Sequence, residues 1–233
     1  MNKRRRVGIT GMGCITPIGS SPDAAWSSVR AGHTGIRRIR AFPTTPFTCS
    51  VGAELDDPPV QAAFAERRWR RWDRTADIAV LATEQALLQA ALLGDEHIPL
   101  RSTMPAIFGT GAGTSYSAAD HHASHNLNGP RAVRPTTVPR AMTNVISAMP
   151  SIRFGLGGIN YVIVAACSAS TIAIGQAVRL VRDGTADRVL CGGADTSMTE
   201  VNFAACATAP TARSSSSMRR MIREPPRPRN RRT

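Results

Sequence analysis

The sequence predicts an α/β protein with a largely parallel sheet over residues 1–208, and three observations lead to this class. Short apolar stretches alternate with amphipathic stretches, which is typical of strands joined by helices. The pattern is clearest around Cys167, where a β-branched apolar run at residues 161–166 changes into a helix that stops at Gly184. Residues 209–233 hold only three large apolar side chains among arginine, serine and proline, so we expect a disordered basic tail there.

Local signals predict the elements of the first half. Residues 6–9 predict a first buried strand. Residues 21–23, Ser-Pro-Asp, begin a helix that ends near Gly32, because a hydroxyl N-cap, a proline and an early acid favour a helix start. Residues 42–59 are irregular with short strands, and residues 74–93 form a helix with an apolar stripe.

The second half contains further strands of the sheet. Residues 105–108 and 188–191 are short apolar strands, each closed by glycines. Residues 114–139 are polar and predict a loop, residues 140–149 predict a short helix, and residues 155–158 predict a turn. These elements complete the α/β pattern.

The formal net charge of +13 is concentrated at the two ends of the chain. Residues 3–6 are all basic, and residues 211–233 contain eight arginines against one glutamate, whereas residues 7–210 hold 17 arginines against 15 acids. A nucleic-acid-binding domain would carry its basic surface on a folded face with stacking aromatics. The folded part lacks both, so we expect no nucleic-acid partner.

The five cysteines are widely spaced, odd in number and without a CxxC pair, which indicates free thiols in a reducing cytoplasm and no zinc site. Residues 161–178 carry no charge, but hydroxyl residues, a cysteine and a glutamine interrupt them, so we expect a strand and a helix rather than a membrane span. Glycines near the N-terminus likewise favour a strand and turn over a signal peptide. We expect a cytoplasmic protein with no membrane partner.

Cys167 is the candidate catalytic residue. Because it lies where a buried strand gives way to a helix, its thiol is at the positive end of the helix dipole, which favours the thiolate. A thiolate presented in this way can attack an acyl thioester. The residues alone leave open the alternative of a buried inert cysteine.

Six segments of the chain form a recognisable set. They are RRVGITGMG with TPIG at residues 5–19, AGHTGI at 31–36, GTGAG at 109–113, NGPR at 128–131, YVIVAACSAS at 161–170 and CGGAD at 191–195. In this order and spacing the chain resembles the β-ketoacyl-acyl carrier protein synthases, condensing enzymes of the thiolase fold. The resemblance is closer to the type I and II elongating enzymes than to the initiating ones, with polyketide ketosynthases as near relatives. It implies the N-terminal half of a thiolase-like fold.

The resemblance also implies an activity and its residues. The activity is a decarboxylative Claisen condensation of fatty-acid or polyketide biosynthesis, an acyltransferase reaction without cofactor or metal. Cys167 aligns with the nucleophile that takes the acyl group from acyl carrier protein. Gly109, Gly111 and Gly113 correspond to the edge of the acyl pocket, where small residues leave room for the chain. A phosphate-binding loop is the alternative, but no Lys-Ser or Lys-Thr pair follows.

Acyl carrier protein is the expected partner. Arg67 and Arg70 match one carrier-binding region of the family, and Arg131 and Arg134 match another. Paired arginines suit the electrostatic steering of an acidic protein. An ordinary solvated basic face is the alternative. The resemblance further implies a homodimer formed through residues 140–149 and the strand before the cysteine.

Family members are nearly twice as long, and their second half supplies two histidines and a lysine to the active site. His121, His122 and His125 do not replace them, since they precede the cysteine in a polar stretch where we expect surface residues. We therefore expect a truncated chain with little or no condensing activity alone. Our hypothesis for its cause is a change of reading frame near residues 205–215.

Two other hypotheses are kept. One is a non-catalytic partner of a complete ketosynthase, similar to a chain-length factor, although the presence of Cys167 argues against it because such partners usually lose the cysteine. The other is a basic adaptor that binds nucleic acid or an acidic membrane surface through its tail.

Overall fold

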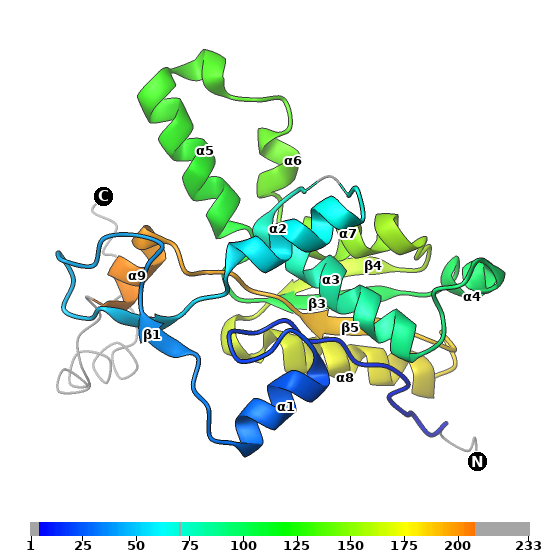
Figure 1. Ribbon diagram of the computed structural model, residues 1–233. Coiled ribbons are helices and arrows are strands. Elements are labelled where there is room, and N and C mark those ends of the chain that lie inside the picture. The colour runs from blue at the N-terminus through cyan, green and yellow to red at the C-terminus, as the bar shows by residue number, and fades with distance from the viewer. Residues whose placement is uncertain (1–4, 70, 208–233) are drawn as a thin grey trace, which may run out of the picture.

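The computed structural model describes residues 5–69 and 71–207, and the predicted tail at residues 209–233 lies outside the described residues. The main sheet has three parallel strands in the order β4-β3-β5, and a separate antiparallel sheet pairs β1 with β2. Helices lie on both faces of the main sheet (Figure 1). The predicted α/β class with a parallel sheet is confirmed.

The central strand of the main sheet is β3, Ala106–Thr110, which is buried at every position. It pairs with β4, Asn160–Val164, on one side and with β5, Leu190–Gly193, on the other. In this register Gly109 lies opposite Gly193. Because the strands are parallel, the segments that follow them meet at one edge of the sheet, where α/β proteins commonly place their sites.

One face of the sheet carries the larger apolar core. There α3, Arg74–Gln89, packs against α7, Val145–Phe154, with α2, Asp57–Glu66, nearby (Figure 1). Asp73 caps α3 by accepting a hydrogen bond from the Thr75 N–H at 2.8 Å. The large apolar side chains buried on this side of the molecule are Val60, Phe64, Ile78, Val80, Leu81, Leu87, Met104, Phe108, Ile146, Phe154 and Leu156.

The opposite face is covered by α8, Ala169–Arg182, which approaches it closely (Figure 1). The buried residues of α8 are three alanines at helical spacing, Ala169, Ala173 and Ala177. A Cβ atom at Gly109 would lie 2.3 Å from the Ala169 carbonyl carbon, so only glycine fits under the first turn of the helix. This fit brings the start of α8 against the ends of the strands.

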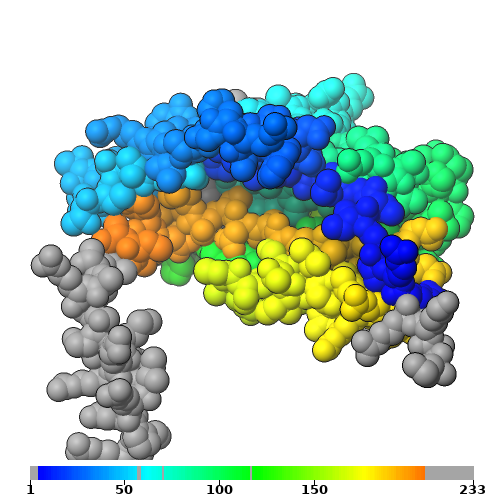
Figure 2. Space-filling model, turned by 90° about the horizontal axis from the view of Figure 1, so that it is seen from below, coloured from blue at the N-terminus to red at the C-terminus, as the bar shows by residue number. Residues whose placement is uncertain are grey.

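The outer side of α8 is open to solvent. Ile172 and Ile174 are 39% and 48% exposed. In Figure 2 a hollow separates α8 from the N-terminal part of the chain, and the segment after residue 190 lies at its floor.

The remaining elements flank these layers. α1, Pro22–Arg30, begins as predicted, because the Ser21 hydroxyl accepts a hydrogen bond from the Ala24 N–H at 3.2 Å. The other short elements are β1 (Ile36–Arg38), β2 (Val51–Ala53), η1 (Asp95–His97), α4 (Ile98–Arg101) and α9 (Glu200–Ala207). Within residues 5–69 and 71–207, no helix combines the length and apolar character needed to cross a bilayer.

The strand predicted at residues 6–9 is not formed, and these residues are exposed. The segment that follows them runs along α3 instead. The Met12 N–H donates to the Gln89 side-chain oxygen at 2.6 Å, and the Cys14 N–H donates to that of Gln85 at 2.9 Å. Backbone donors that a strand would pair with a neighbouring strand are thus satisfied by glutamine side chains of a helix.

The prediction of a loop at residues 114–139 is also wrong. These residues form α5 (Ser115–Asn128), η2 (Pro130–Ala132) and α6 (Thr137–Ala141). Figure 1 shows α5 and α6 projecting from the rest of the protein, so these helices bury little surface and show no apolar stripe. The helix predicted at residues 140–149 starts and ends later in the chain, as α7.

Candidate active site

Cys167 lies at the junction of β4 and α8, as predicted. β4 ends at Val164, the short turn η3 spans Ala166–Ser168, and α8 begins at Ala169. Ala166 has a φ of 46°, a left-handed conformation that costs a non-glycine residue roughly 1–2 kcal/mol. The strand turns into the helix so tightly that Cys167 is exposed to solvent rather than buried.

Hydrogen bonds hold this turn in place. The Ala165 N–H donates to the Thr110 carbonyl of β3 at 3.4 Å, and the Ser168 N–H and hydroxyl donate to the Ala165 carbonyl at 3.2 and 2.8 Å. Because the Ser168 hydroxyl points back in this way, it does not cap α8. The Ala169 N–H donates to the Ala166 carbonyl, so η3 runs directly into α8 and Cys167 lies in the turn just before the helix.

The predicted glycines take two different positions. Gly111 and Gly113 lie in the loop after β3, and a Cβ atom at Gly111 would be 3.5 Å from the Ala166 Cα, so this loop contacts the cysteine turn. Gly109 lies within β3 beneath α8. The structure thus brings the loop and Cys167 together, while Gly109 seats the helix that follows the cysteine.

Asp195 is a further residue of this site, and no role was predicted for it. It follows β5, and its Oδ2 atom accepts hydrogen bonds from the Gly111 and Ala112 N–H groups at 2.6 and 3.0 Å. The Thr110 hydroxyl donates to the same oxygen at 3.1 Å. An available signal was its place in the CGGAD segment, because an acid directly after a parallel strand lies where the strand ends meet.

The first predicted pair of carrier-binding arginines lies after α2. The Nε atom of Arg67 donates to a Glu84 carboxylate oxygen at 2.7 Å, and its guanidinium lies 5.7 Å from the Trp69 ring centre. The hydrogen bond with Glu84 raises the pKa of Arg67, so its charge is fixed and partly engaged within the protein. Arg70 lies outside the described residues.

The second predicted pair lies between α5 and α6, on the projecting part of Figure 1. Arg131 and Arg134 are both exposed. Neither forms an ion pair with any residue in the described part of the chain. Both guanidinium groups are therefore open to a partner.

The clustered histidines lie on α5. His122 and His125 are exposed, whereas His121 is half-buried and its Nδ1 atom has no hydrogen-bond partner among the described residues. In the part of the chain that the structure describes, no three histidine, cysteine or acidic side chains gather closely enough to hold a metal ion.

The other cysteines differ from Cys167 in their surroundings, and all five are free thiols. Cys191 lies in β5, where burial raises the pKa of its thiol. Cys14 and Cys49 are half-buried, and Cys206 on α9 is exposed. Cys206 is therefore a useful comparison for the reactivity of Cys167, because it is exposed without a strand–helix turn.

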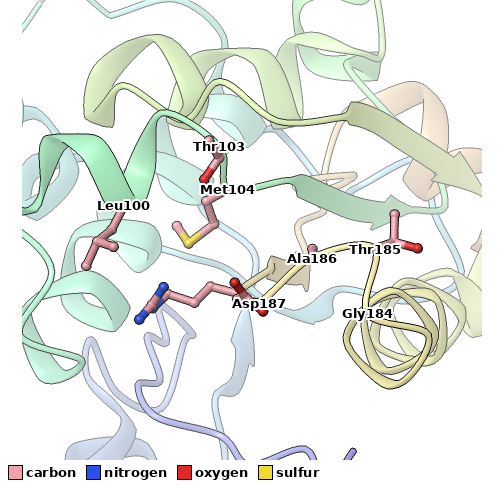
Figure 3. A pocket seen from close by; sticks show the side chains of 8 residues that line it. Leu100, Thr103, Met104, Gly184, Thr185, Ala186 and Asp187 are labelled. Carbon is pink, nitrogen blue, oxygen red and sulfur yellow. The ribbon is translucent and has the colours of Figure 1, made fainter. Parts of the chain in front are cut away.

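A cavity of about 280 Å³ opens at the amino ends of the strands, away from the cysteine turn (Figure 3). Leu100 and Met104, which precede β3, line it together with Gly184 and Asp187, which precede β5. Cys167 follows the carboxyl end of β4, so the cavity and the thiol lie at opposite ends of the strands. The cavity is not part of the candidate site.

The fold and the site define a class: α/β proteins that expose a thiol where a parallel strand turns into a helix, beside a glycine-rich loop. The sequence matches the family described as "Beta-ketoacyl synthase, N-terminal domain" over residues 4–224. The chain belongs to this β-ketoacyl synthase family, which confirms the resemblance seen in the sequence and the thiolase-like fold it implies.

Relatives and solved structures agree with this assignment. The 3-oxoacyl-[acyl-carrier-protein] synthase 2 of Synechocystis sp. is 32% identical over 207 residues, which are 89% of this chain and 49% of that protein. The ishigamide ketosynthase/chain length factor aligns with a TM-score of 0.75 and 27% identity, covering 86% of this chain and 50% of its own. A type II ketosynthase in complex with its acyl-carrier protein, AntDE:AntF, shares the fold at a TM-score of 0.74 and 18% identity, covering 88% and 49%. The chain spans about half the length of the curated relatives it matches.

Proposed function

We propose that this chain acts in fatty-acid or polyketide biosynthesis as part of a β-ketoacyl-acyl carrier protein synthase, with Cys167 as the residue that carries the acyl group. One observation supports this most directly: the exposed thiol follows a left-handed residue and lies in the short turn η3, which leads directly into α8. An inert structural cysteine is typically buried in a core, whereas reactive cysteines are accessible and close to positive potential.

In the proposed acylation step, the Cys167 sulfur attacks the carbonyl carbon of an acyl thioester. A carbon–sulfur bond to the protein forms, the carbon–sulfur bond to the carrier breaks, and the thiol proton lost from Cys167 balances the proton gained by the released carrier thiol. The positive end of the α8 dipole lies toward this turn and favours the negative charge that forms on the carbonyl oxygen during the attack.

The condensation that follows is proposed for a protein of the relatives' full length. There, a malonyl group on the carrier loses carbon dioxide, and the resulting carbanion attacks the acyl-enzyme and releases the Cys167 thiolate. The loop after β3 supports a place for the acyl chain beside the thiol. Its residues Gly111, Ala112 and Gly113 have no bulky side chains, and the loop contacts the cysteine turn.

Acyl carrier protein is the proposed partner. Arg131 and Arg134 offer two exposed positive charges on the projecting α5–α6 part, and Arg67 adds a fixed charge near α2. An acidic protein would be steered toward such groups over several ångströms, more strongly at low salt. A contribution of Arg70 to carrier binding is predicted from the sequence alone, because Arg70 lies outside the described residues.

We also propose a homodimer in the cytoplasm. β4 is one of the two outer strands of the described sheet, so one row of its backbone groups has no strand partner among the described residues, and a second copy can pair there. Free cysteines are typical of a reducing compartment. The near balance of charge in residues 7–210 supports a protein without a nucleic-acid or membrane partner.

Acylation of the chain itself tests the central part of this proposal. The protein is incubated with a short acyl thioester of N-acetylcysteamine, digested, and its cysteine peptides are measured by mass spectrometry. We expect the acyl group on Cys167, its loss in Cys167→Ser, and its retention in Cys206→Ser, which removes the exposed cysteine of α9. Equal labelling of Cys206 and Cys167, or labelling of neither, would refute the proposal.

A further inference from the structure

Asp195 joins two segments that are far apart in the sequence. From the end of β5 it reaches the loop after β3, where a single carboxylate oxygen accepts the Gly111 and Ala112 N–H groups at 2.6 and 3.0 Å and the Thr110 hydroxyl at 3.1 Å. Hydrogen bonds to an ionised acceptor are stronger than those between neutral groups. The last residue of β3 and the first two residues of the loop are therefore tied to the segment after β5.

The next residue along the chain secures the other end of the loop. The Thr75 hydroxyl donates to the Gly113 carbonyl at 3.2 Å, and it lies 2.6 Å from the Thr196 hydroxyl. A hydroxyl has one proton, so with Thr75 donating to Gly113, Thr196 donates to Thr75. Two consecutive residues after β5 thus hold both ends of the loop, directly or through Thr75.

The loop in turn supports the cysteine turn. The Thr110 carbonyl accepts the Ala165 N–H at 3.4 Å, and the hypothetical Cβ atom of Gly111 comes within 3.5 Å of the Ala166 Cα. Ala166 is the left-handed residue that sets the direction in which Cys167 leaves the strand. A continuous path of hydrogen bonds and contacts therefore leads from the Asp195 carboxylate to the residue before the thiol.

We propose that Asp195 is a positioning residue for Cys167: by fixing the loop after β3 it holds the turn in the conformation that presents the thiol. This role rests on the proposed function, in which Cys167 carries the acyl group. Asp195 itself is exposed, so replacing it creates no buried cavity and leaves no buried charge without a partner. The change acts on the loop rather than on the core.

Hydrogen–deuterium exchange measures this coupling without requiring any activity. In Asp195→Ala we expect the amides of residues 109–114 and also those of residues 164–169 to exchange about tenfold faster, because hydrogen bonds to a charged group are lost. In Asp195→Asn, whose side-chain oxygen can accept the same N–H groups, exchange should return toward the wild-type rate. Asp187→Ala is the matched control, since it removes an exposed aspartate at the opposite edge of the sheet.

Three outcomes would overturn the proposal: unchanged exchange at residues 164–169 in Asp195→Ala, equal exchange in the Asn and Ala variants, or the same effect in Asp187→Ala. Acylation by the N-acetylcysteamine thioester provides a second measurement, in which Asp195→Ala should slow labelling of Cys167 about tenfold relative to Asp187→Ala. If the wild-type protein is not acylated, the proposed function fails, but the exchange rates still decide whether Asp195 holds the turn.

Discussion

The two faces of the β4-β3-β5 sheet are built from different kinds of residue. On the α3–α7 face, large side chains such as Phe108 and Ile146 are buried almost completely. On the α8 face, the helix contributes three alanines, and β3 contributes Gly109, under the first turn of the helix, together with the fully buried Ile107. The outer side of α8 leaves Ile172 and Ile174 exposed.

The two faces therefore contribute differently: one mainly stabilises the fold, and the other mainly positions α8. Burial of large apolar side chains is the main source of folding free energy, so the α3–α7 face should hold the domain together. Small residues contribute less burial but let two backbones approach closely. On the α8 face this close approach places the start of the helix, and with it Cys167, against the ends of the strands.

The largest expected effect is on the α3–α7 face. Replacing Ile146, which is fully buried, by alanine should lower the free energy of unfolding by about 2–5 kcal/mol. The matched change Ile174→Ala, on the exposed side of α8, should cost within about 0.5 kcal/mol. Urea unfolding at pH 7 measures both. Equal losses would show that the outer side of α8 is covered in solution and that the two faces do not differ as described.

A smaller effect is expected where α8 rests on the sheet. Gly109→Ala adds a methyl group only 2.3 Å from the Ala169 carbonyl carbon, so the helix must shift, at a cost of about 1–3 kcal/mol. Gly175→Ala makes the same change within α8, where no atom lies within 4 Å, and should stabilise the protein by about 0.5–1 kcal/mol. Thermal unfolding of the two variants should therefore move in opposite directions. A shift in the same direction would mean that the close contact at Gly109 does not constrain the helix.

The smallest expected effect concerns Asp77, a buried carboxyl of α3 on the larger core face. Burial raises the pKa of Asp77, although the Trp72 N–H and Arg71 partly oppose this by hydrogen bonding to the carboxylate at 2.9 Å. The folded state then binds a proton more tightly than the unfolded state. The stability that Asp77 contributes is complete below about pH 3.9 and is lost as pH rises through its folded pKa.

Urea unfolding between pH 3.5 and 6.5 tests this sign. The free energy of unfolding of the wild type minus that of Asp77→Asn should fall with rising pH. The same measurement on Asp187→Asn, which removes an exposed carboxylate that pairs with Arg5 at 2.8 Å, controls for the loss of a surface charge. A difference that stays constant or grows with pH would contradict the raised pKa.

Local sequence patterns predicted the parts of this fold that depend on residues close together in the chain. The change from strand to helix around Cys167 and the cap at Ser21 were visible because each depends on neighbouring residues. The strand predicted at residues 6–9 was wrong because an apolar run does not show what its backbone will pair with. The segment after it is held by Gln85 and Gln89, which lie far along the chain on a helix.

The same limit explains what was missed in the candidate site. The helix α5 has no apolar stripe because it projects into solvent, so periodicity could not reveal it. Asp195 contacts Gly111 across 84 residues of sequence, and a hydrogen bond over such a distance leaves no local pattern. The thiol and the loop were predicted separately, whereas their contact through Ala166 required the structure.

Ala166 is the left-handed residue directly before the nucleophile. Replacing it by glycine would remove the steric cost of the left-handed conformation but would add freedom to the unfolded chain, and the two effects are similar in size. A melting temperature would therefore reveal little about this position. What would change is the number of directions available to the sulfur, since glycine accepts either sign of φ. The direction of the nucleophile is therefore set by the contacts around Ala166, which hold its backbone against the preference of its own methyl group.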